Sequence, residues 1–100
     1  MMTAPASENA LEKLAEQIAE TVREHPSVER LDGGEFGVVA THFPGRRVTG
    51  VRMGPPIEVA VVLHVDRPLP DVVDELRTRV QGLAGEVPVN LTISDVHSGT

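Results

Sequence analysis

The side chains of this sequence best suited to acid–base chemistry or metal binding are its four histidines, His25, His42, His64 and His97. None of them is spaced from another ligand type in a recognisable metal-binding pattern. His42 and His64 fall on predicted strands and could lie near one another, but the sequence names no third ligand. The chain has no cysteine, which excludes disulfides, thiolate catalysis and cysteine-bearing zinc sites. We therefore expect neither a metal nor a cofactor.

The residues that could support nucleophilic catalysis or phosphate chemistry lack their usual context. The serines do not lie in a nucleophile-elbow sequence, so a Ser-His-Asp site has no support beyond the residue types. Gly33, Gly34 and Gly37 do not follow a strand in the dinucleotide-binding order, and no P-loop is present. No catalytic residue can be assigned, and we expect the protein not to be an enzyme.

One segment favours recognition rather than catalysis. Residues 42–47 read HFPGRR, which combines an aromatic residue that we expect to be exposed, a Pro-Gly turn and two guanidinium groups. Guanidinium groups bind carboxylates or phosphates through two parallel hydrogen bonds. The candidate partner-binding residues here are Phe43, Arg46, Arg47 and Arg52. The alternative is an ordinary hairpin turn with a solubilising tip.

A row of glutamates offers a second candidate surface. Glu8, Glu12, Glu16, Glu20 and Glu24 recur every fourth residue in a predicted helix, so their carboxylates form one slowly drifting row. Charge runs of this kind usually form a solvated face. The functional alternative is a contact surface for a basic partner, including the Arg46–Arg47 loop of a neighbouring copy. Its candidate partner-binding residues are Glu12, Glu16 and Glu20.

The charge distribution bears on the class of partner. The net charge is −6 and the isoelectric point is about 5.1, which disfavours nucleic acid. Residues 42–67 nevertheless hold four arginines against Glu58 and Asp66. This split layout is suited to head-to-tail self-association or to one anionic partner. No apolar run is long enough to span a membrane, and the N-terminus lacks a secretory pattern, so we expect a cytoplasmic protein.

Hydrophobic periodicity predicts an α+β domain. We expect helices over 8–24 and from Pro70 to Gly85, a short strand over 28–31, and strands near 36–43, 47–53, 57–65 and 88–96. The predicted architecture is a two-layer sandwich: a mostly antiparallel four- or five-stranded sheet with two helices on one face, in the order α-β-β-β-β-α-β. Residues 1–7 should form a disordered tail and residues 8–97 a single domain. The predicted core comprises Leu14, Ile18, Val22, Val38, Val59, Val61, Leu63, Val73, Leu76, Val80, Leu91 and Ile93.

The order of these segments resembles the alkaline shock protein family, also called envelope stress response proteins, and most of all its actinobacterial branch. The segments are LAEQIAETVREHPSVERLDGG, FGVVATHFPGRRVTGVRM, IEVAVVLHVDRPLPDVVDELRTRVQGLAG and PVNLTISDV, which together span about residues 10–96. The most specific parts are the proline-led helix start at Pro68–Val73 and the closing alternating strand. The chain departs from the family at His25–Val28, where Pro-Gly-Val is usual, and at the end of the second helix.

The resemblance implies a non-enzymatic cytoplasmic protein linked to cell-envelope stress. Members self-associate, and some are held at the inner face of the membrane by a small anchor protein. We therefore expect the partners to be the protein itself and a membrane anchor, with only indirect membrane contact and no nucleic acid. The alternative function is a module that binds a small anionic ligand or nucleic acid through the Phe43–Arg47 loop.

Overall fold

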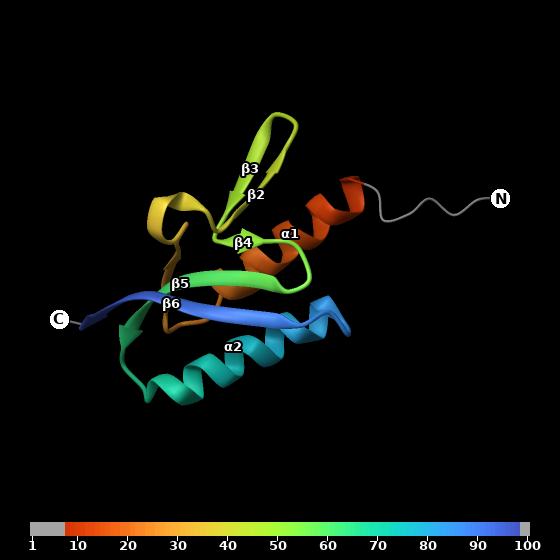
Figure 1. The fold of residues 1–100 in the computed structure, drawn as a ribbon. Helices are drawn as coiled ribbons and strands as arrows, with labels where there is room; N and C mark the ends of the chain where they lie inside the picture. The colour runs from red at the N-terminus through yellow and green to blue at the C-terminus, as the bar shows by residue number, and fades with distance from the viewer. Residues whose placement is uncertain (1–7, 99–100) are drawn as a thin grey trace.

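The computed structural model describes residues 8–98, with the side chain of Glu8 left out. Its elements, in chain order, are α1 (Glu8–Arg23), β1 (Val28–Leu31), the short 3-10 helix η1 (Glu35–Gly37), β2 (Ala40–Phe43), β3 (Arg46–Thr49), β4 (Val51–Arg52), β5 (Ile57–Val65), α2 (Leu69–Ala84) and β6 (Val89–Ser98). The protein is thus an α+β fold, as predicted (Figure 1). The expected tail over residues 1–7 lies outside the described residues. Within residues 8–98, no helix is both long and apolar enough to cross a membrane.

The main sheet is built around β5. β6 pairs with it in parallel from Ile57–Val89 to Val65–Ser98, and α2 makes the connection between the two strands. β1 and β4 pair antiparallel with successive parts of β5, residues 61–63 and 58–59. Because β6 occupies one edge of β5 along its whole length, β1 and β4 must share the other edge. The sheet is therefore mixed, and its longest ladder is parallel rather than antiparallel.

The predicted hairpin around Pro44-Gly45 is present as β2 and β3, but it forms a separate two-stranded sheet instead of belonging to the main sheet. Gly45 at its turn has φ 79°, as the Pro-Gly pair indicated. The predicted strand over 36–43 begins only at Ala40, because positive φ angles at Gly34, Phe36 and Gly37 turn the chain first. The predicted strand over 47–53 divides at Gly50, whose φ of 88° sends β3 into the hairpin and β4 into the main sheet.

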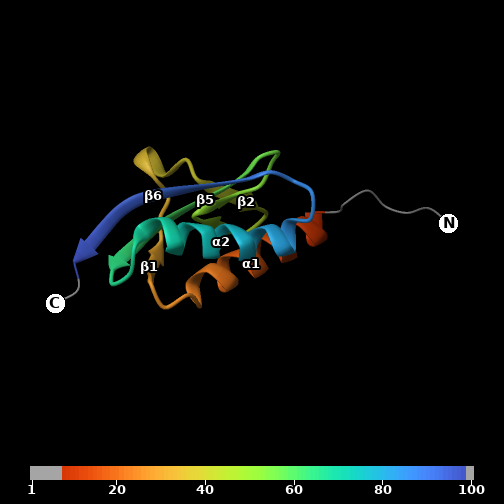
Figure 2. The same ribbon diagram turned by 90° about the horizontal axis from the view of Figure 1, so that it is seen from below.

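Both helices contribute to one core. Figure 2 shows α1 and α2 side by side, beneath β5 and β6 in that view. The apolar stripe of α1 buries Ile18 and Val22, and that of α2 buries Val72, Leu76 and Val80, against the inward-facing alternate residues of β5. Two predicted core residues are wrong. Val38 is 59% exposed because it follows the 3-10 turn instead of lying in a strand, and Val72 rather than Val73 faces the core.

Candidate functional site

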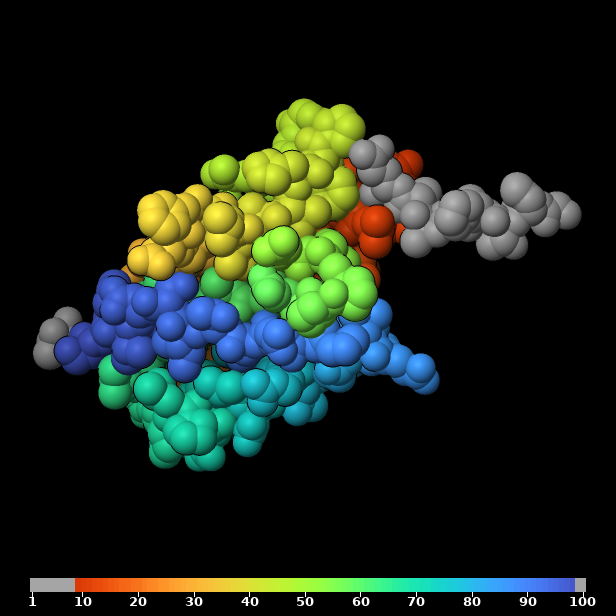
Figure 3. All heavy atoms as spheres, in the orientation of Figure 1, coloured from red at the N-terminus to blue at the C-terminus, as the bar shows by residue number. Residues whose placement is uncertain are grey.

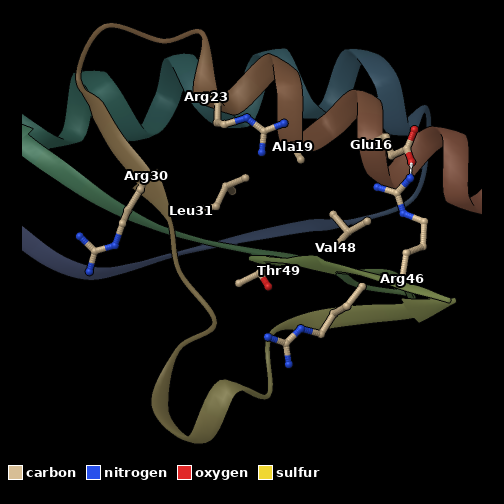
Figure 4. A pocket seen from close by; sticks show the side chains of 9 residues that line it. Glu16, Ala19, Arg23, Arg30, Leu31, Arg46, Val48 and Thr49 are labelled. Carbon is tan, nitrogen blue, oxygen red and sulfur yellow. Dashed lines mark ion pairs between the residues drawn. The ribbon is translucent and has the colours of Figure 1, made fainter.

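The hairpin, α1 and β1 enclose a groove of about 390 Å³ that is lined by four arginines. We call it the arginine groove; its lining residues are Glu16, Ala19, Arg23, Arg30, Leu31, Arg46, Arg47, Val48 and Thr49. Figure 4 shows Arg30 and Arg46 at its two ends, with Ala19, Leu31 and Val48 between them. The groove therefore has an apolar floor and a cationic rim. With four arginines against one glutamate, the lining carries a charge of +3 in a protein whose net charge is −6.

Three elements deliver these guanidinium groups. α1 ends with Arg23 in its last turn, a position that the helix dipole favours for a cation. β1 contributes Arg30, which alternates with the inward-facing Leu31. β3 contributes Arg46 and Arg47 directly after the turn. Arg23 and Arg30 were missed by the sequence analysis, because α1 and β1 come together with the hairpin only in the folded chain.

The arginines of the groove differ in how they are paired. Arg46 bonds both Glu12, at 3.2 Å, and Glu16. Arg23 pairs with Glu20 at 3.0 Å, and Arg30 pairs with Glu29 at 3.0 Å. Arg47 is exposed and forms no ion pair within the described part of the chain. All the paired arginine side chains are about half exposed, so these surface pairs contribute little and can exchange for an incoming anion.

The structure places the predicted partner-binding residues in different surroundings: besides Arg47, which is exposed, and Glu20, which pairs with Arg23, three further situations occur. Phe43 is only 9% exposed and belongs to the core, so the expectation of an exposed aromatic at the hairpin is wrong: alternation in β2 turns this ring inward. Arg46 pairs with both Glu12 and Glu16 of its own chain. Arg52 lies away from the groove lining, on β4, and pairs with Glu58 at 3.6 Å.

A second charged cluster joins the C-terminal end of α1 to the start of α2. We call it the helix-end network; its members are His25, Ser27, Asp66, Arg67 and Glu75. The ring of His25 is 1% exposed; its Nδ1 accepts the backbone N–H of Ser27 at 3.0 Å, so its Nε2 carries the proton that is donated to Glu75 at 2.8 Å. Hydrogen bonds from Arg67 and then from His25 lower the pKa of the Glu75 carboxyl to about 2.

A third cluster lies across β1, β5 and β6. His64 and His97 are direct neighbours in the β5–β6 ladder, and Glu29 contacts His97 at 2.8 Å and His64 at 3.7 Å. The hydrogen bond that His97 donates to the Glu29 carboxylate, reinforced by Asp95, raises the pKa of His97 above its ordinary value. The sequence left open that His42 lies near His64, but the neighbour of His64 in the sheet is His97, because β6 rather than the hairpin lies beside that part of β5. Within residues 8–98, no three His, Asp or Glu side chains are arranged to hold a metal ion.

Of the three clusters, the arginine groove has the composition of a binding site. The helix-end network and the Glu29–His97 cluster satisfy their own polar atoms with internal partners. The groove combines an open surface, an apolar floor and guanidinium groups that are unpaired or only weakly paired. Such an arrangement can bind carboxylate or phosphate groups. Neither a protein-family model, nor a curated protein, nor a solved structure matches the chain.

Proposed function

We propose that this chain is a non-enzymatic interaction protein of the alkaline shock type, a two-layer α+β domain that associates with itself or docks on a small membrane-anchor protein. The resemblance of its segments to that family supports the class. One structural observation supports the mode of binding: four guanidinium groups from α1, β1 and β3 line one groove in an acidic protein. The groove is then the docking surface, and the segment that it binds is acidic. The protein is cytoplasmic, or peripheral at the inner face of the membrane through its anchor.

The guanidinium of Arg47, which has no ion pair within residues 8–98, provides the sharpest test of this proposal. A fluorescently labelled glutamate-rich peptide should bind the parent protein, with an affinity that falls as salt screens the charges. Arg47→Gln should weaken binding about tenfold, because one charge-assisted hydrogen bond to the peptide is lost. The matched control is Arg79→Gln on α2, which removes the same charge from an exposed position outside the groove. Equal losses in the two variants would show that only net charge matters and would count against the groove.

The size of the groove favours a second candidate function, the binding of a small anionic ligand. Its volume of about 390 Å³ lies within the range of small-molecule sites. The ligand would bind in the groove rather than at the tip of the Phe43–Arg47 loop, because Phe43 is buried. Calorimetric titration with pyrophosphate and with a short RNA separates the two functions. Tight, Arg47-dependent binding of either probe, without binding of the acidic peptide, would favour the second candidate over the first.

A further inference from the structure

The least protected apolar side chain of the described residues is Phe36, in the loop between β1 and β2. Its side chain is 94% exposed, and the nearby Val38 is 59% exposed. Its backbone has φ 61° and ψ 13°, a left-handed conformation that is strained for a bulky residue. An exposed aromatic ring on a strained backbone serves no purpose in the core, and such strain concentrates at functional positions. The ring is therefore available for a contact outside the monomer.

The loop holds the ring out on a well-braced turn. The N–H of Gly34 donates to the Asp32 carboxylate at 2.9 Å, and that of Gly37 donates to the carbonyl of Gly34 at 3.1 Å. The base of the loop is closed by the N–H of Val39, which donates to the carbonyl of Gly33 at 2.8 Å. Figure 3 shows this segment, in yellow, at the surface between β6 and the hairpin. A projection that is already ordered loses little conformational entropy when it is buried in a partner.

The chemistry of this projection matches that of the arginine groove. Phe36 is preceded by the exposed carboxylate of Glu35. The groove offers an apolar floor for the ring, the exposed guanidinium of Arg47 for the carboxylate, and further guanidinium groups that can stack on an aromatic face. The ring does not fill the groove of its own chain, as its exposure shows. A second copy of the chain can supply it.

From this complementarity we infer that two copies form a closed dimer, in which the Glu35–Phe36 projection of each copy occupies the arginine groove of the other. The inference rests on the proposed function, since it names the acidic segment that the groove binds. The loop and the groove adjoin: the Cβ position of Gly33 is 3.7 Å from Thr49 Cγ2, and Figure 4 shows the loop beside the groove. Because the projection and the groove adjoin, a two-fold axis can pass between them, so both contacts form at once and no open filament results.

A membrane is a poorer match for the same ring. The carboxylate of Glu35 adjoins the ring and would be repelled by the headgroups of an anionic bilayer. One aromatic ring also supplies little insertion energy by itself. The dimer contact is small as well, because two exchanged projections bury less than a standard protein interface. The expected association is therefore reversible, in the micromolar to millimolar range.

Sedimentation equilibrium over that concentration range tests the dimer. The parent should follow a monomer–dimer equilibrium, and Phe36→Ala should raise its dissociation constant at least about tenfold. Val65→Ala, which truncates another exposed apolar side chain outside the loop and the groove, should leave it unchanged. Urea unfolding should find Phe36→Ala as stable as the parent, because a ring that is 94% exposed buries almost no apolar area in the monomer. A parent that stays monomeric at millimolar concentration, or a dimer unaffected by Phe36→Ala, would overturn the inference.

Charge exchange tests the pairing itself. Glu35→Arg and Arg47→Glu should each abolish dimerisation, and the double variant, in which both contacts are rebuilt with reversed charges, should restore it. Arg79→Glu is the control for charge alone. Because the chain has no cysteine, Glu35→Cys and Arg47→Cys can also be mixed, and they should form a disulfide-linked heterodimer that neither variant forms alone. Absence of both the rescue and the heterodimer would refute this pairing.

The failure of the inference can be told apart from the failure of the proposed function. If the glutamate-rich peptide binds through Arg47 while the protein remains monomeric, the groove is a docking surface and only its occupant is wrong. If neither the peptide nor a second copy binds, both proposals fail. A third measurement tests binding to vesicles of phosphatidylcholine and phosphatidylglycerol. If the monomer binds these vesicles through Phe36, the dimer inference is wrong and the ring contacts a lipid surface instead.

Discussion

The arginine groove and the helix-end network are both rich in charge, yet they are constructed in opposite ways. In the network, the ionic and polar groups include the buried His25 and Ser27, and each of these has a defined partner. In the groove, the guanidinium groups are about half exposed, and Arg47 has no ion pair among the described residues. The structure of the network is thus maintained by contacts between its side chains. The structure of the groove is maintained by the backbone, which brings α1, β1 and the hairpin together.

This difference shows where polar side chains support the fold and where they remain available for a partner. Burial makes every unpaired polar atom costly, so a buried network must be complete. Exposed ion pairs compete with water and contribute little, so they can be replaced by a ligand without loss of the fold. Backbone substitutions and side-chain substitutions should therefore affect the stability of the two regions to different extents.

The largest expected effect is at Gly50, the residue that divides the hairpin from the main sheet. It has φ 88°, and a Cβ there would lie 2.6 Å from Leu31 Cβ at the floor of the groove. Gly50→Ala should therefore lower the free energy of unfolding by about 3 kcal/mol, through backbone strain and a steric clash. Urea denaturation measures this. Gly82→Ala is the control: with open space around it in α2, it should stabilise the protein by about 0.5–1 kcal/mol.

The next effect concerns the helix-end network. His25→Leu removes the acceptor of the Ser27 N–H and the donor to Glu75. Because Ser27 is fully buried, its N–H would be left without a partner, and the expected loss of stability is about 2 kcal/mol. His42→Leu, at an exposed position of β2, should change stability by less than about 0.5 kcal/mol. Equal losses from the two histidines would contradict the distinction between the network and the exposed surface.

Much of this architecture is readable in the sequence because it follows from local patterns. The stripe from Leu14 to Val22 predicted α1, and the alternation from Ile57 to Val65 predicted β5 with its observed bounds. The α+β class was predicted for the same reason. The division at Gly50 was not, since a glycine within an alternating segment signals a bulge or close approach but does not say which sheet follows. The exposure of Phe36 was missed because FGVVATHF has the composition of a strand.

The candidate site was only half predictable. Arg46 and Arg47 lie in one short segment with a turn signal, so their clustering is visible in the sequence. Arg23 and Arg30 reach the same groove through tertiary packing of α1 and β1, for which no local pattern exists. The helix-end network has the same character: it joins His25 to Glu75 across fifty positions of the chain. Contacts of this range depend on the assembled fold rather than on periodicity.

A smaller effect on stability should appear at acidic pH, through the carboxyl group of Glu75. The hydrogen bonds from Arg67 and His25 lower the pKa of Glu75 to about 2, from an ordinary value of 4.5. A carboxyl whose pKa is lower in the folded state stabilises the protein above its unfolded pKa, and this contribution is lost as the pH falls through the folded pKa. Between pH 4.5 and about 2, the parent should therefore lose more stability than Glu75→Gln does. Urea midpoints measured for both proteins across this range test the sign, and parallel curves would contradict it.

The smallest effect on stability is expected from the ion pairs of Arg46 with Glu12 and Glu16. Arg46→Gln breaks the contacts with Glu12 and Glu16, but all three side chains are partly exposed, so stability should fall by only about 0.5 kcal/mol. Arg79→Gln, which removes a charge from outside the groove, supplies the baseline in the same urea titration. A loss near 2 kcal/mol for Arg46→Gln would make these pairs as structural as the helix-end network. The glutamate row would then hold the hairpin in place, and the groove could not release its arginines to a partner without weakening the fold.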